Sequence, residues 1–153
     1  MFTVPTLSPA IRAEILNLLE QLRQDFQLTF LFIAHDLQVV QHICDRVAVM
    51  YVGQLVELGS TPQIFSNPPH PYTAALMSAI PKADPTKPMK LSALKGEIPN
   101  PVNPPTGCRF HTRCQFTQDI CRTTVPEWQE HAAGQFAACH FAEELDLSGP
   151  AAV

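Results

Sequence analysis

Apolar and polar positions in the first part of the chain predict a helix followed by a buried strand. Apolar residues recur at helical spacing over residues 9–26, and charged residues mostly populate the other side. Ser8 can cap this helix, and Pro9 suits its first turn, where no backbone donor is required. Residues 28–34 are continuously apolar and aromatic. We therefore expect a strand there that is covered on both faces, which implies parallel neighbours.

A short helix and a hairpin are predicted next. Asp36 can cap a helix over residues 37–43. Two apolar runs, 47–52 and 55–58, flank Gly53-Gln54. A two-residue loop with glycine first is typical of a type II′ turn, so the pattern predicts a tight β-hairpin.

Two more short helices are predicted after the hairpin. The sequence Ser60-Thr61-Pro62 begins the first, which should end near Asn67 because two prolines follow. Pro71 begins the second. Its expected apolar face consists of Tyr72, Ala75, Leu76 and Ala79.

Proline content divides the chain near residue 81. Twelve of the 15 prolines fall between Pro62 and Pro126. We expect an α/β domain over residues 1–80, a partial sheet with flanking helices. A polyproline-like linker over 81–107 and a small Pro- and Cys-rich module over 108–142 should follow, the latter needing a staple to fold. Residues 143–153 complete the chain as a tail.

Charge and hydropathy narrow the class of protein. The net charge is −4 without a basic stripe, so a nucleic-acid partner is excluded. No apolar run approaches the roughly 20 residues of a membrane span, so direct membrane insertion is not expected. The N-terminal stretch MFTVPTLSP lacks the features of a signal peptide, which predicts a cytoplasmic protein.

Four of the five cysteines gather in the last third of the chain, with the spacing Cys108-x5-Cys114-x6-Cys121-x17-Cys139. In a cytosolic chain such a cluster indicates metal or redox chemistry before disulfides. An iron–sulfur cluster, a Zn(Cys)4 site, two disulfides and four free thiols all remain open. Five histidines are expected mostly at the surface, and two of them, His111 and His140, adjoin the cysteine cluster; the others are His42, His70 and His131.

Four stretches together resemble a known family. They are the run ending in His35-Asp36, DRVAVMYVGQLVELG, NPPHPYTAALMSAIP and NPPTGCRFHTRC. They are similar to the ATP-binding subunits of ABC importers, in the oligopeptide/dipeptide and nickel uptake branch. The likeness runs from about residue 11 to residue 140 and covers only the carboxyl end of such a subunit. It implies a partial P-loop NTPase-like sheet, a second ATP-binding subunit and membrane permease subunits as partners, and a peripheral place on the cytoplasmic membrane face.

The resemblance gives His35 a role. In the family, the matching residue is the switch histidine, which contacts the ATP γ-phosphate and helps to orient the attacking water. The alternative is a histidine satisfied by local backbone at a strand end. This sequence contains no G-x-x-x-x-G-K-[ST] phosphate loop, ABC signature or Walker B carboxylate. We therefore expect the ATP contact to be vestigial, with no ATP hydrolysis by this chain alone.

The resemblance also implies a cofactor, because similar carboxyl-terminal modules carry a [4Fe–4S] cluster. All four positions, Cys108, Cys114, Cys121 and Cys139, are filled here, and zinc is the alternative. The first hypothesis is a truncated ATP-binding subunit of a peptide importer. A second is a stand-alone iron–sulfur or zinc-binding interaction module. A third is a broken gene product that exposes apolar faces and sheet edges.

Overall fold

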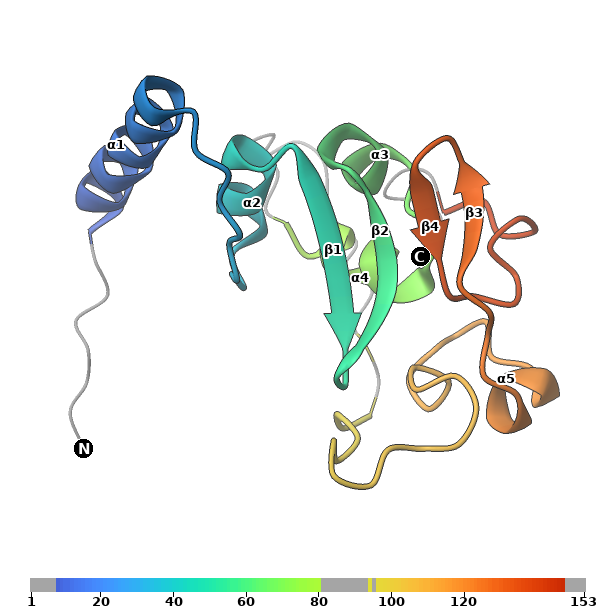
Figure 1. Cartoon of the computed structure of the whole chain (residues 1–153). Coiled ribbons are helices and arrows are strands. Elements are labelled where there is room, and N and C mark those ends of the chain that lie inside the picture. The colour runs from blue at the N-terminus through green and yellow to red at the C-terminus, as the bar shows by residue number, and fades with distance from the viewer. Residues whose placement is uncertain (1–7, 81–93, 95, 148–153) are drawn as a thin grey trace, which may run out of the picture. The chain divides into compact units, whose positions relative to one another are not determined.

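The computed structural model describes residues 8–80, 94 and 96–147 (Figure 1). Most of the expected linker (81–93 and 95) and the end of the expected tail (148–153) lie outside the described residues. The chain forms two compact units, residues 1–43 and 44–153.

The first unit contains two helices that begin and end where the sequence predicts. Helix α1 spans Pro9–Phe26, and Ser8 caps it by accepting a hydrogen bond from the Ile11 N–H at 3.4 Å. Helix α2 spans Leu37–Ile43. The Asp36 carboxylate accepts from the backbone N–H of Gln38 at 3.0 Å. Local capping chemistry therefore fixes both starts.

The prediction of a buried strand over residues 28–34 is wrong. The segment has no strand pairing, and its side chains are exposed, Leu31 by 92% and Ile33 by 97%. A strand needs a hydrogen-bonded neighbour, and the described part of the first unit supplies none. Apolar composition alone could not provide that partner.

The second unit is built on the predicted hairpin. Strand β1 spans Arg46–Tyr51 and pairs antiparallel with β2, Gln54–Ser60. The loop is Val52-Gly53, and both residues have positive φ, 46° and 74°. Two positive φ angles define a type I′ turn, so the predicted type II′ turn at Gly53-Gln54 is wrong by one residue.

The sheet continues through two short strands from the end of the chain. Strands β3 (Gln129–Ala132) and β4 (Gln135–Ala137) complete the order β1-β2-β4-β3. Every pairing is antiparallel, so the expected parallel sheet is absent among the described strands. The β2–β4 pairing places Glu57 opposite Ala137. Segments far apart in the sequence thus share one sheet (Figure 1).

The described part of the second unit also contains three helices. Helix α3 (Thr61–Ser66) starts with a capping box in which Ser60 and Gln63 satisfy each other's backbone N–H groups. Helix α4 spans Pro71–Ser78, and α5 spans Asp119–Thr123. The buried face of α4 differs from the expected one: it consists of Pro71, Thr73, Ala74 and Ala75.

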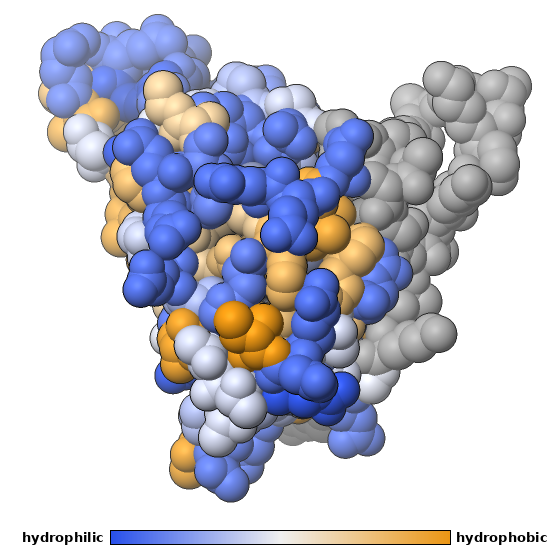
Figure 2. Space-filling model, turned by 90° about the vertical axis from the view of Figure 1, so that its right-hand side faces the viewer, coloured by the Kyte–Doolittle hydropathy of each residue, from blue (hydrophilic) through white to orange (hydrophobic). Residues whose placement is uncertain are grey.

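One core serves the hairpin, α4 and the cysteine-bearing segment. The rings of Tyr51 and Tyr72 lie 4.7 Å apart between centroids, and Phe110 lies 5.2 Å and 5.3 Å from them. Phe110 is 1% exposed. On the face in Figure 2, hydrophilic residues dominate the described surface, with apolar residues in small groups between them.

Candidate functional site

Four cysteine side chains come together beside this core. Cys108 and Cys114 lie in turns before α5, Cys121 lies in α5, and Cys139 follows β4. All four are free thiols, and all four line one cavity. The structure therefore brings together the cysteines that the sequence singles out.

A close backbone approach makes this gathering possible. The N–H of Cys108 donates to the carbonyl oxygen of Cys121 at 2.8 Å. A Cβ atom on Gly107 would lie 2.4 Å from that same oxygen, and Gly107 has a φ of +68°. Only glycine fits such a contact and such a dihedral without strain. Any other residue would push the two cysteine-bearing segments apart.

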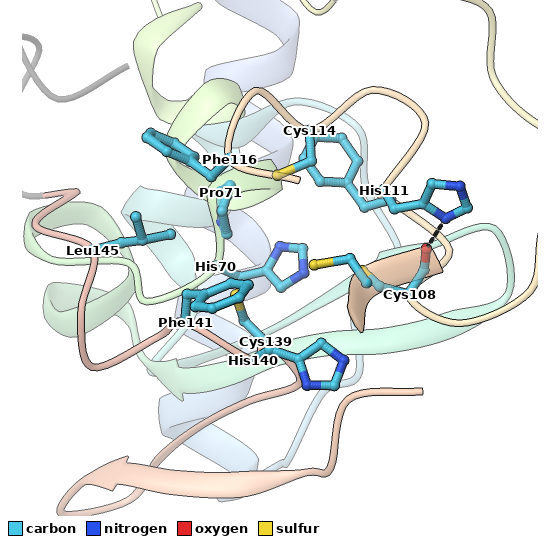
Figure 3. Close-up of a pocket in the computed structure, with 12 residues that line it drawn as sticks. His70, Pro71, Cys108, His111, Cys114, Phe116, Cys139, His140, Phe141 and Leu145 are labelled. Atoms are coloured by element: carbon cyan, nitrogen blue, oxygen red, sulfur yellow. Dashed lines mark hydrogen bonds between the residues drawn. The ribbon is translucent and has the colours of Figure 1, made fainter. Parts of the chain in front are cut away.

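The cavity that the thiols line is small and mostly apolar. Its volume is about 20 Å³, enough for about one water molecule. Aromatic and aliphatic side chains complete its walls, together with three histidines. Figure 3 shows the sulfur atoms of Cys108 and Cys114 and the ring of His70 directed toward the space between the surrounding loops. We call this space the thiol cavity.

Burial favours the neutral form of three of these thiols. The pKa of Cys114 is raised to about 11 and that of Cys139 to about 12, mainly by burial, while a backbone N–H lowers each and the neighbouring cysteines contribute to the rise. Burial also raises the pKa of Cys108. Among the described residues, no group of three His, Cys, Asp or Glu side chains stands as a ready metal site. Four soft sulfur donors in one mostly apolar cavity nevertheless match the donor set of a four-thiolate centre.

His70 is the most buried polar side chain of the cavity, at 1% exposure. It caps α4, because its Nδ1 accepts from the Tyr72 N–H at 3.1 Å. Its own backbone N–H donates to Glu57 Oε2 at 3.3 Å. Burial lowers the pKa of His70 to about 3, so the ring is neutral. With Nδ1 as acceptor, the ring hydrogen resides on Nε2.

The other two histidines of the cavity are bound to backbone carbonyls. His111 Nδ1 lies 2.9 Å from the oxygen of Cys108, and His140 Nε2 lies 3.0 Å from that of Thr124. The expectation of a surface position is wrong for His70. Its signal was in the sequence: a histidine directly before the proline that starts a helix stands at the capping position.

Glu57 is a buried carboxyl group that the sequence analysis missed. It lies in β2 with 0% exposure. Burial raises its pKa to about 7, while Thr73, the His70 N–H and Gln135 act in the opposite direction. Although Thr73 is near enough for this effect, neither its hydroxyl nor Glu57 Oε1 has a well-formed hydrogen bond within the described residues. The sequence signal for this buried group was a charged residue between the apolar residues of a predicted strand.

His35 belongs to the first unit, whereas every residue that lines the thiol cavity belongs to the second unit. It is exposed and lies between the 28–34 segment and α2. Its neighbour Asp36 is the cap of α2, as the sequence predicts. No described helix combines the length and the apolar content that crossing a membrane requires.

Comparisons with known proteins define the class. The chain is 48% identical over 139 residues to the oligopeptide transport ATP-binding protein AppF of Bacillus subtilis, covering 90% of this chain and 42% of that protein. It is 46% identical over 136 residues to the dipeptide transport ATP-binding protein DppF of Haemophilus influenzae, covering 89% and 42%. These relatives are ATP-binding subunits of peptide transporters. The chain spans less than half of their length.

A family comparison places the chain more closely. Residues 56–121 match the family described as the oligopeptide/dipeptide transporter, C-terminal region. The match begins in β2 and ends at Cys121, so it includes His70 and three of the four cavity cysteines. Residues 56–121 of this chain therefore correspond to the carboxyl-terminal region that this family comparison describes.

Proposed function

We propose that this chain forms the carboxyl-terminal part of an ATP-binding subunit that energises peptide uptake by an ABC importer. The observation that carries the proposal is the 48% identity over 139 residues to a subunit of that kind. The intact subunit would pair with a second ATP-binding subunit and with permease subunits at the cytoplasmic membrane face. Residues 1–80 would complete the ATP-binding domain, 81–107 would be a linker, 108–142 the cysteine module and 143–153 a tail.

His35 would contact the ATP γ-phosphate in the intact subunit. Two features support this role: the side chain is exposed, and a helix capped by the next residue holds the backbone beside it. A neutral or cationic imidazole can donate a hydrogen bond to phosphate near pH 7. The phosphate loop that would complete the site is absent from this sequence. The chain by itself would therefore not hydrolyse ATP, and micromolar ATP binding by calorimetry would contradict this part.

A chimera tests the proposal directly. The matching region of the Bacillus subtilis relative is replaced by this chain, and oligopeptide uptake is measured in cells that lack the native subunit. We expect the chimera to restore uptake. His35→Ala should reduce uptake at least about 100-fold, because loss of a group that acts on the transferred phosphate typically costs that much. His42→Ala, an exposed histidine in α2, is the matched control and should retain uptake.

Two results would contradict the proposal. An inactive chimera that is expressed and assembled would show that this chain does not supply the carboxyl-terminal part. Full uptake by the His35→Ala chimera would show that His35 has no role in ATP use.

We further propose that Cys108, Cys114, Cys121 and Cys139 hold a metal centre, with [4Fe–4S] ahead of zinc. Their support is the shared cavity and the all-sulfur donor set. Neutral thiols must lose their protons on binding, and the positive charge of the metal offsets the cost of burying four thiolates. A bound cluster would supply one-electron redox chemistry or a covalent staple for the module.

Metal analysis distinguishes these possibilities. Anaerobically purified protein should contain iron and acid-labile sulfide and should be brown, whereas zinc without sulfide would indicate the alternative metal. Cys114→Ser should abolish the iron content. Cys44→Ser is the matched control, because Cys44 lies outside the thiol cavity, and it should leave the iron content unchanged. A metal-free wild-type protein after reconstitution would contradict the proposed centre.

A further inference from the structure

The orientation of one side chain suggests a role in the thiol cavity beyond the four cysteines. His70 is held from three sides: its Nδ1 by the Tyr72 N–H, its backbone by Glu57, and its ring by Phe110 at 5.8 Å between centroids. These contacts fix the direction of the ring. They leave its remaining nitrogen, Nε2, on the cavity side (Figure 3).

Nε2 carries the ring hydrogen and needs an acceptor. Within the described part of the chain, the hydrogen bonds of His70 involve Nδ1 and the backbone, and none engages Nε2. A donor that faces a mostly apolar cavity is stabilised when an acceptor is placed beside it there. The cysteine sulfurs of the cavity are acceptors of this kind, and a thiolate accepts far better than a neutral thiol.

We propose that His70 is a positioning residue of the thiol cavity that donates its Nε2 hydrogen to a cysteine sulfur when the four thiolates bind a metal. This inference rests on the proposed metal centre. The hydrogen bond would draw negative charge from the sulfur and stabilise the bound form. His111 and His140 do not compete for this role. Each ring has a nitrogen bound to a backbone carbonyl, which can only accept, so the single hydrogen of the neutral ring is already used there.

Two substitutions separate the two ring nitrogens. His70→Asn keeps an acceptor at the δ position for the α4 cap, because asparagine is a good capping residue, but it has no donor at the ε position. His70→Gln places an amide donor near the ε position and loses the cap. A purely structural role predicts that His70→Gln is the worse variant, whereas the donor role predicts that His70→Asn is.

Cobalt(II) is the probe, because its sulfur-to-cobalt charge-transfer band reports thiolate electron density whichever metal is native. The full chain is titrated anaerobically with Co²⁺, and binding is followed by this band. We expect His70→Asn to weaken Co²⁺ binding about 10- to 100-fold, as removal of an outer hydrogen bond typically does. The charge-transfer band of the His70→Asn complex should lie at longer wavelength than that of wild type. A thiolate that accepts no hydrogen bond transfers its electron to cobalt more easily. His70→Gln should keep the wild-type band.

The outcomes separate this inference from the proposal on which it rests. Wild-type protein that binds no Co²⁺ in a thiolate site overturns both. Wild-type binding with an unshifted band and unchanged affinity in His70→Asn overturns only the role of His70. If His70→Asn fails to fold by circular dichroism, His70→Gln decides. If the charge-transfer band of His70→Gln is displaced from the wild-type position, the inference is overturned. If the band lies at the wild-type position, the inference is supported.

Discussion

Glu57 shows how one residue links the cavity to the sheet. Its carboxyl group is fully buried in β2, it accepts from the backbone of the cavity residue His70, and its other oxygen has no well-formed hydrogen bond among the described residues. Its pKa of about 7 lies above the value of 4.5 for an ordinary glutamate. Near neutral pH, therefore, folding retains a proton that the unfolded chain would lose.

This protonation predicts a pH dependence of stability. Because the folded-state pKa is raised, the stabilisation by protonated Glu57 is fully present below pH 4.5 and is lost as the pH rises to 7. The loss is on the order of 3 kcal/mol, from about 1.4 kcal/mol per pKa unit. Glu57→Gln should lack this loss, so its free energy of unfolding should rise relative to wild type between pH 4.5 and 8. Urea denaturation at several pH values measures the difference.

Other titrating groups contribute equally to the stability of wild type and of Glu57→Gln, so their contributions cancel when the two proteins are compared. His70 has a lowered pKa, so its contribution changes in the opposite direction, being lost as the pH falls, but it is common to both proteins. Glu144→Gln, at an exposed position after β4, is the matched control and should follow the wild-type profile. Parallel profiles for Glu57→Gln and wild type would contradict the prediction.

Among the elements, the β1–β2 hairpin contains a conformation that its sequence disfavours. Val52 has a φ of +46° at the first loop position of a type I′ turn. A β-branched residue is strained there, whereas asparagine is preferred. The Arg109 guanidinium donates to the Val52 carbonyl oxygen, which ties the cysteine-bearing segment to this turn. Tertiary contacts thus hold a loop that local preference would not choose.

Val52→Asn should therefore stabilise the protein. It would create an Asn-Gly type I′ turn and relieve strain worth about 1 kcal/mol. The urea midpoint should rise without a change in slope. Val102→Asn is the matched control, because Val102 is 89% exposed with an ordinary φ, and it should change stability by no more than about 0.5 kcal/mol. Unchanged or lower stability in Val52→Asn would show that the turn is not strained.

On the scale of the whole molecule, the two units differ in how much apolar surface they bury. The apolar side chains of α1 remain about half exposed, as in Ile15 at 42% and Leu18 at 53%. In the second unit, Val49 and Val56 are 6% and 4% exposed. A helix of this length without a packed face is marginal in water. The first unit therefore gains little stability from its own packing.

Hydrogen exchange should reveal this difference. We expect amide protection in α1 to be at least roughly 100-fold lower than in β1, because opening α1 exposes little additional apolar surface. Mass spectrometry of the full chain measures both segments. In the chimera with the amino-terminal part of the relative, protection of α1 should rise. Equal protection of α1 and β1 in the chain alone would contradict the prediction.

The helix starts could be predicted from the sequence, because capping residues next to each helix determine them. Ser8, Asp36 and Ser60 cap the helices expected of them. The 28–34 segment was mispredicted because a strand depends on a partner that its own composition does not specify. Strand β3 is mostly polar and β4 has only three residues, so both were missed, because pairing rather than hydropathy creates them.

The candidate site was predicted in its members but not in its geometry. The four cysteine positions were identified from their clustering, and they line one cavity. The sequence marks the positions of His70 and Glu57, but their burial arises from packing between β2, α4 and the late turns, which those local signals do not specify. Titratable side chains are expected outside the core, and tertiary contacts override that expectation here.

The pairing of β2 with β4 has a consequence for synthesis. Strand β2 ends at Ser60, whereas β4 begins only at Gln135. At ordinary translation rates, the ribosome needs on the order of 10 s to produce the intervening residues. Throughout that interval one edge of the nascent hairpin has no β4 to cover it and can template pairing with another chain. Only the synthesis of residues 135–137 supplies the strand that covers this edge.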